Sequence, residues 1–344
     1  MGISSLRGVV GVGIQSALGT PATSFTYFPA LSANVTGEQI AQALPPEVGG
    51  SLFSRGSYKG GVLSRGEVSF VIRPNLVGPL LRSLFAQETV TAVNGQTGRW
   101  DHLFRVGDHL PAQRRWLTVR RYVGPAYGEQ ISDAAVGQFN IEVAATNVAN
   151  ATVQLVGRQW DEIAADPSIS AATGDFFQAT AASVQMGGNA FIVDRATISI
   201  GAELTDNEFT VGSYYLDEIT MLRRMATIIA DVRIRNRDLM ARVYRNNAAA
   251  PTGTGLGAWS PVIFRTSFTA TFVTSENPPQ QLVINFPSVD LLTLNVQMQG
   301  NELIRAQLQG NVSLTSTNYD AGNPGSDTLQ PIFVTLRNNR EDPY

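Results

Sequence analysis

Short segments of alternating hydrophobic and polar residues run along most of the chain, and the clearest lies at residues 136–157. Phe139 and Ile141 point to one side of an extended strand, whereas Asn140 and Glu142 point to the other. A short turn and a second alternating segment follow. The pattern predicts a β-hairpin of a half-buried antiparallel sheet.

Similar segments, rich in β-branched and aromatic residues and bounded by turn residues, occur throughout the chain. They cover residues 25–31, 66–73, 114–124, 139–146, 151–157, 190–204, 227–235, 264–275, 280–286, 291–299 and 305–314. Two short segments instead have the i, i+4 spacing of a helix, shown by Val77 with Leu81 and by Leu239 with Val243. The sequence therefore predicts a mainly β fold with a short helix in each half.

The hairpin at 136–157 is written a second time at 289–310. A gapless overlay, 153 positions apart, keeps Val136/Val289, Val143/Val296, Gln154/Gln307, Leu155/Leu308 and Gly157/Gly310. It predicts that Leu292, Leu294 and Val296 share one face and that Ile304, Ala306 and Leu308 do so on the return strand.

Residues 70–81 overlay residues 232–243 in the same way, 162 positions apart, and both place a strand before a helix. We interpret the two matches as an internal duplication, with one domain at 1–165, a second at 176–335 and a C-terminal tail at 336–344. The extra residues of the first half are expected in a polar loop at 87–98. Two unrelated β domains are the alternative.

Composition excludes several functions. The 344 residues carry a net charge of −3 and only 15% charged residues, which provides no basic field for nucleic acid or an anionic membrane. A surface so poor in charge suggests that other protein covers it. Cysteine is absent, so disulfides and thiolate chemistry are impossible. The N-terminus lacks signal-peptide features and no segment is apolar enough to span a membrane, so synthesis in a cytoplasm is expected.

Candidate chemistry is sparse. His102 and His109 each follow an aspartate, an arrangement that a hydrolase or a metal site could use, but the sequence favours a polar loop or edge strand with incidental histidines. The glycines at 8–16 lack the strand and helix of a dinucleotide site and indicate a flexible arm. The arginines at 223–245 could contact nucleic acid, although the aspartates among them favour a salt-bridged strand face.

Three blocks resemble the major tail tube proteins of long-tailed, non-contractile bacteriophages, the siphoviruses. They are GIQSALGTPATSFTYFP at 13–29, the segment from Pro45 to Leu81 that contains VIRPNLVGPLL, and the segments 102–123 and 127–157 that end in the hairpin. The resemblance covers roughly residues 8–160 and departs at Gln15 and Leu18, where many relatives carry an acidic and an aromatic residue. Doubled-domain tube proteins of thermophilic Thermus phages look most similar.

The resemblance implies two tail-tube-type β-sandwich or partial-barrel domains, each with a flanking helix and neither enzymatic nor cofactor-dependent. It implies trimeric, pseudo-hexameric rings that stack into a tube for double-stranded DNA in the virion tail. It also implies a tape measure protein in the lumen and tail terminator and tip proteins as partners. An adhesion module on a virion or cell surface and the inner tube of a contractile injection system are the alternatives.

Two sets of site residues follow from the resemblance. The candidates for facing the lumen are Asn140, Glu142, Thr152, Gln154, Thr293, Asn295, Gln297 and Gln307. The candidates for contact between rings are Asn94, Thr252, Thr254, Arg337, Arg340 and Tyr344. Simple solvent exposure of the first set is the alternative.

Overall fold

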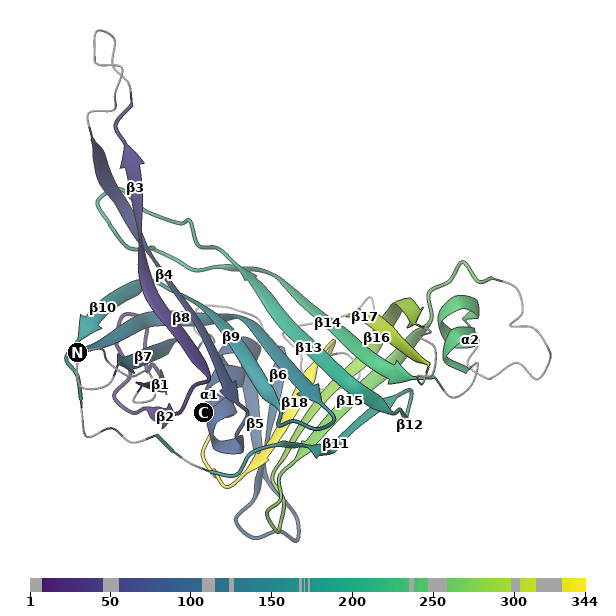
Figure 1. The fold of residues 1–344 in the computed structure, drawn as a ribbon. Helices are drawn as coiled ribbons and strands as arrows, with labels where there is room; N and C mark the ends of the chain where they lie inside the picture. Colours follow the sequence, from purple (N-terminus) through teal and green to yellow (C-terminus); the bar gives the residue numbers. More distant parts are fainter. Residues whose placement is uncertain are drawn as a thin grey trace.

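The computed structural model describes residues 8–45, 56–106, 115–123, 127–166, 169, 171–172, 174–234, 238–246, 259–297, 304–313 and 330–344. Strands dominate these residues, accompanied by two short helices (Figure 1). The prediction of a mainly β fold is confirmed.

The strands of the first half are β1 (Gly8–Ile14), β2 (Thr26–Phe28), β3 (Ser32–Ala43), β4 (Ser57–Val71), β5 (Ala86–Ala92), β6 (Trp100–Val106), β7 (Leu117–Val123), β8 (Tyr127–Ala144), β9 (Asn150–Gly157) and β10 (Gln159–Ile163), with α1 (Pro74–Phe85) after β4. Those of the second half are β11 (Gln178–Met186), β12 (Asn189–Ala190), β13 (Val193–Leu204), β14 (Met221–Arg233), β15 (Arg265–Val273), β16 (Gln281–Gln297), β17 (Arg305–Val312) and β18 (Phe333–Asn338), with α2 (Asp238–Arg245) after β14.

Eight antiparallel strands form one continuous sheet that we call the long sheet. Its order is β3-β4-β9-β8-β13-β14-β17-β16, so the first four strands come from the first half and the last four from the second. The two halves join where β8 pairs with β13. The backbone ladder thus passes from one half to the other without interruption.

Two side sheets pack beside the long sheet. The first has the order β2-β1-β7-β8-β10, and the second has the order β12-β11-β15-β16-β18-β6-β5. The strands β8 and β16 each belong to the long sheet and to one side sheet. Each contains a β-bulge where it changes sheet, between Val136 and Gln138 in β8 and between Leu291 and Thr293 in β16. A bulge bends a strand, which lets one strand turn the corner between two sheets.

These bulges give the correspondence between the two hairpins. Phe139 pairs with Val153 just as Leu294 pairs with Leu308, so each residue corresponds to the one 155 positions later. The gapless sequence overlay is therefore wrong by two residues. An error of two keeps every side chain on its own face, since the period of a strand is two, but it misplaces the bulge.

The bulge also overturns one predicted alternation. Leu294 is buried, yet Leu292 is 40% exposed because Leu291 takes the buried place beside the bulge. Ile304, predicted to be buried with Ala306 and Leu308, is exposed just before β17 begins.

The helix α1 packs against β8, β5, β6 and β18. Its predicted apolar stripe is correct, since Val77 and Leu81 are both buried in the main hydrophobic core. In α2, Leu239 is buried and Val243 packs against the same core. The main core contains residues of both halves, including Phe139 and Phe286.

The strand β1 corrects the prediction of a flexible arm at 8–16. It lies between β2 and β7, and Val10 and Val12 are buried. Gly11 permits this packing because a Cβ there would lie 2.5 Å from the ring of Tyr27. Glycine in this strand therefore marks a close approach of side chains rather than freedom of the backbone.

The predicted polar loop at 87–98 is wrong for its first half, because Ala86–Ala92 forms β5 and pairs with β6. The other edge of β6 pairs with β18, so this hairpin of the first half extends the second side sheet. The strand β18 continues through Asn338, across the predicted boundary at 335/336. The residues after it fold back so that Tyr344 covers Gly78 of α1.

Candidate functional site

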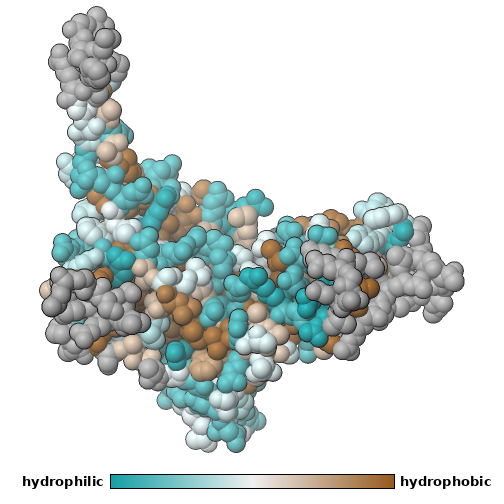
Figure 2. Space-filling view, viewed as in Figure 1, coloured by the Kyte–Doolittle hydropathy of each residue, from teal (hydrophilic) through white to brown (hydrophobic). Residues whose placement is uncertain are grey.

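One face of the long sheet is mostly polar, with Met225 and Ile229 of β14 as exposed apolar exceptions. Directly opposed residues of antiparallel strands share a face, so the pairing register identifies its members. From β3 to β16 they include Asn34, Thr36, Arg65, Glu67, Thr152, Gln154, Asn140, Glu142, Thr197, Ser199, Thr227, Asp231, Gln307, Gln309, Thr293 and Asn295. We call this surface the polar face. Figure 2 shows hydrophilic residues over much of β4, β8 and β13.

Seven of the eight residues predicted to face the lumen occupy the polar face, and the side chain of the eighth, Gln297, lies outside the described part of the structure. Glu142, Gln154, Thr293, Asn295 and Gln307 are exposed, and Asn140 and Thr152 are half-buried. The residues between them, such as Phe139 and Leu308, are buried on the opposite side. The sequence thus places these residues on one surface correctly, and their role in a lumen stays a prediction.

Polar side chains are linked across the junction of the two halves. Ser199 in β13 donates a hydrogen bond to Asn140 Oδ1 in β8 at 2.6 Å, and Gln138 Nε2 donates to Ser199 Oγ at 3.1 Å. These contacts satisfy polar groups that the sheet would otherwise leave partly desolvated.

The arginines of the polar face are neutralised. Arg195 pairs with Glu142, and Arg65 pairs with Asp206. Arg233 and Arg305 share Asp194, with Nε–Oδ distances of 2.8 and 3.2 Å. Arg223 lies opposite Glu203 in the pairing register. The sequence analysis expects a salt-bridged strand face for the arginines at 223–245, and it does not foresee which acid each arginine of the polar face meets.

Asp194 is the central acid of this network. Hydrogen bonding and the positive charge of Arg233, together with Arg305, hold its pKa below the ordinary value for a carboxyl group. The side chain therefore stays ionised at neutral and mildly acidic pH. The remaining acids Glu67 and Asp231 accept hydrogen bonds from Gln154 and Gln307. The polar face consequently presents balanced charge with some excess of carboxylate.

The long sheet ends in two edges without a partner among the described residues. One is the edge of β3 that points away from β4, and the other is the edge of β16 at residues 293–297 that points away from β17. Such edges expose a row of backbone N–H and C=O groups that another strand can satisfy. Each end of the long sheet therefore lacks a further strand, although two carbonyls of these strands already accept side-chain hydrogen bonds, Ala33 from Arg121 and Leu294 from Tyr244 of α2.

His102 proves to be a structural residue of β6 rather than part of a loop or edge strand. Its Nδ1 lies 2.8 Å from Glu88 Oε1 and its Nε2 lies 2.8 Å from the carbonyl oxygen of Arg340. The side chain is fully buried between these acceptors, so neither nitrogen is available as a base or metal ligand. His109 lies outside the described residues.

The C-terminal residue completes this cluster. The Tyr344 ring lies 5.1 Å from the His102 ring, measured between centroids. The backbone N–H of Tyr344 donates a hydrogen bond to the Glu88 carboxylate, and the Tyr344 hydroxyl accepts one from Asn338. Burial raises the pKa of Tyr344 to about 12. Tyr344 is therefore packed within its own chain.

The other residues predicted to contact the next ring are placed as follows. Asn94 is exposed in the turn between β5 and β6. Arg337 pairs with Asp101, and Arg340 covers the Tyr344 ring. Thr252 and Thr254 lie outside the described residues. Of the described candidates, Asn94 and Arg340 are exposed.

The hairpin of β3 and β4 is a feature that the sequence analysis missed. Its outer part, from Ala41 to Ala43 and from Ser57 to Lys59, is exposed and projects away from the rest of the molecule (Figure 1). The alternation there is weak, since both faces are in contact with solvent, so no apolar pattern marks the strand.

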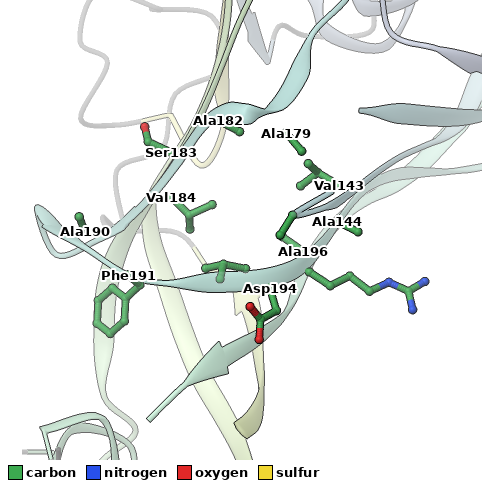
Figure 3. Close-up of a pocket in the computed structure, with 13 residues that line it drawn as sticks. Val143, Ala144, Ala179, Ala182, Ser183, Val184, Ala190, Phe191, Asp194 and Ala196 are labelled. Carbon is green, nitrogen blue, oxygen red and sulfur yellow. The ribbon is translucent and has the colours of Figure 1, made fainter. Parts of the chain in front are cut away.

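A pocket at the end of the β8–β13 junction offers little chemistry. Figure 3 shows that its lining consists mainly of alanine and valine from β8, β11 and β13. Its one acid, Asp194, is held by arginines. Within the described residues no group of three or more acids and histidines could hold a metal ion, and neither helix is long or apolar enough to span a membrane.

A broad, mostly polar sheet that lacks a further strand at each end is the main feature of the described surface. The family described as "Phage tail tube protein" matches residues 5–278, which is most of the chain, and the chain belongs to this family. Comparison with curated proteins finds no match. Family membership makes the protein a component of the virion tail and gives it a structural role.

Proposed function

We propose that three copies of this chain form a closed ring and that stacked rings form the hollow tail tube through which double-stranded DNA passes. The single observation that supports this proposal best is the long sheet, which has one polar face and an open edge at each end. The proposal places the chain in a non-contractile, siphovirus-type tail of the doubled form.

Ring closure follows from the two open edges. They differ from each other, so β16 of one copy can pair with β3 of the next in a head-to-tail contact. Such contacts close into a ring when the rotation between copies is a fraction of a full turn. The β8–β13 junction already joins two similar halves in this manner, so three chains would give six similar units.

The number of strands sets the width of the ring. With strands about 4.8 Å apart and tilted by about 40°, the 24 strands of three long sheets form a barrel roughly 48 Å across between backbones. Side chains occupy about 5 Å on each wall, which leaves roughly 38 Å. This space admits a DNA duplex about 20 Å across. Two chains would leave only about 22 Å, which is hardly wider than the duplex.

The charges of the polar face suit a channel for DNA. A duplex carries one negative charge per ~1.7 Å and would be retained by free arginines on the wall. The pairing of Arg195, Arg233 and Arg305 with carboxylates removes that attraction. We therefore place the polar face, with Asn140, Glu142 and the other six predicted residues, on the lumen side.

Ring stacking would use the parts that project from the ring. Strands of a barrel are tilted along its axis, so the β3–β4 hairpin, which extends beyond its neighbours, reaches toward the adjacent ring. The turn with Asn94 is a second candidate. During assembly the lumen would hold the tape measure protein, with terminator and tip proteins at the two ends.

Electron microscopy of the purified protein tests the proposal. After concentration it should form hollow filaments whose rotational average shows three chains and six similar units. Val296→Lys should abolish filaments and leave a folded monomer, because a charged side chain pointing inward on an edge strand blocks pairing. Val296→Ile is the matched control and should form filaments. Discrete particles of the unaltered protein at every concentration would contradict the proposal and favour an adhesion module.

A further inference from the structure

The molecule contains an internal template for the contact between its copies. At the β8–β13 junction, Phe139 lies opposite Ile200, Asn140 opposite Ser199 and Ile141 opposite Ile198. The first and third pairs are buried on the core side, and the middle pair is hydrogen-bonded on the polar face. At this junction β8 of the first half pairs with β13 of the second half, which gives a model for pairing between copies.

Both open edges have a counterpart at that junction. The strand β16 corresponds to β8, since the bulge and the pairing of Phe139 recur 155 positions later at Leu294. The strand β3 corresponds to β13, because β3 pairs with β4, β13 pairs with β14, and β4 corresponds to β14. Phe70 of β4 pairs with Ala151 as Val232 of β14 pairs with Ala306, so β14 is 162 positions beyond β4.

The pairing within each strand pair then fixes the register of β3. Asn34 lies opposite Glu67 of β4, and Thr197 lies opposite Ile229 of β14, which is 162 positions beyond Glu67. Thr197 therefore corresponds to Asn34, 163 positions earlier, and Ser199 corresponds to Thr36.

We infer that β16 of one copy pairs antiparallel with β3 of a second copy with Asn295 opposite Thr36. The same register puts Thr293 opposite Glu38, Leu294 opposite Gly37, Val296 opposite Val35 and Gln297 opposite Asn34. This inference rests on the proposed function and adds to it the partner strand and the residues that meet.

The side chains agree with this register on both faces. Val35 is fully buried and would extend its apolar row to Val296, as Ile198 does to Ile141. The Trp160 ring lies over Gly37, where a Cβ would be 2.8 Å away, and supplies apolar surface opposite Leu294. A shift by one residue would bring apolar and polar side chains opposite each other.

The polar face supplies a more specific match. Within the chain a serine hydroxyl donates to an asparagine, Ser199 to Asn140. In the contact between copies, the corresponding pair is the Thr36 hydroxyl and the Asn295 side chain. A hydroxyl residue on one strand thus again faces an asparagine on the other. Shifts by two residues preserve the faces but lose this pair, since Asn295 would then meet Asn34 or Glu38.

Disulfide trapping tests the register, since the natural chain has no cysteine. Thr36→Cys with Asn295→Cys in one chain should give intermolecular crosslinks in assembled protein. Asn34→Cys or Glu38→Cys with Asn295→Cys should react at least ~10-fold more slowly, because diagonal neighbours lie about 7–8 Å apart and a disulfide needs Cα atoms within about 6.8 Å. Asn140→Cys with Ser199→Cys is the matched control and should close within single chains.

The outcomes of the crosslinking experiment distinguish a wrong strand register from a failure of the proposed tube. If filaments form and a shifted pair reacts fastest, or no β3–β16 pair reacts while the control closes, the inference is overturned and the tube stands. If no assemblies form, both fall. Hydrogen exchange of the unaltered protein gives an independent measurement: amides at 34–38 and 293–297 should gain protection on assembly, and unchanged exchange there would also overturn the inference.

Discussion

Removing the acid that holds two arginines should turn the polar face into a surface that retains DNA. Asp194 pairs with Arg233 and Arg305, so Asp194→Asn leaves both guanidinium groups without their carboxylate. Both pairs are partly exposed, so the loss of folding free energy should be about 1 kcal/mol or less. Filament assembly should therefore persist in this variant.

The gain in DNA binding can be worked out from the number of freed charges. Each chain releases two arginines, which gives six in the proposed ring of three chains. If a duplex lying against the wall meets about four of them, the slope of log K against log salt steepens by about 3.6, and affinity falls roughly 100-fold between 50 and 200 mM salt. Wild-type filaments should bind weakly, with a shallow salt dependence.

Cosedimentation of filaments with a short fluorescent duplex over a series of salt concentrations measures this difference. Asp194→Glu keeps the carboxylate and should behave like the wild type, and Glu142→Gln, which frees only Arg195, should have about half the effect. The reasoning is refuted if Asp194→Asn filaments retain no more duplex than wild-type filaments. It is also refuted if the extra binding does not depend on salt.

Three further predictions concern the cluster around the C-terminal tyrosine. Tyr344→Ala should lower the free energy of unfolding, measured by urea denaturation, by about 2–4 kcal/mol, because it empties a site packed against His102 and Phe104. Tyr344→Phe removes only the hydroxyl and should lower it by about 1 kcal/mol or less. Because the pKa of Tyr344 is raised to about 12 in the fold, its contribution is complete below pH 10 and should be lost between pH 10 and 12, and Tyr344→Phe should lack this loss. Gly78→Val should displace the Tyr344 ring, since a Cβ at residue 78 would lie 2.0 Å from that ring. The substitution should therefore lower the stability of the Tyr344→Ala variant far less than that of the wild type. Equal losses of stability in both backgrounds would show that the two residues are not coupled.

The parts of the fold that could be predicted from the sequence are those where one face is buried and the other is wet. The hairpin around Phe139 and Ile141 and the helix with Val77 and Leu81 have such a pattern, and the structure contains both. The polar face follows directly, because the residues between the apolar positions must point the other way.

The parts that could not be predicted lack that contrast or depend on distant partners. The strand β1 was interpreted as a flexible arm because Gly8, Gly11 and Gly13 carry no side chain to alternate. The outer β3–β4 hairpin has solvent on both faces. The pairing of Asp194 with Arg305 joins residues far apart in sequence, and no local pattern reveals which acid meets which arginine.

The junction of the two halves would give the proposed doubled chain a thermodynamic advantage in ring formation. A ring of six separate units requires five association steps, and each loses translational and rotational freedom worth about 4–15 kcal/mol. A ring of three doubled chains requires two such steps, because the β8–β13 pairing is already made within each chain. The pairing of β6 with β18 makes this junction a double one, since the halves are joined through a side sheet as well as the long sheet. The contact between copies must therefore supply less free energy per ring than contacts among six single units, which favours closure of the proposed ring.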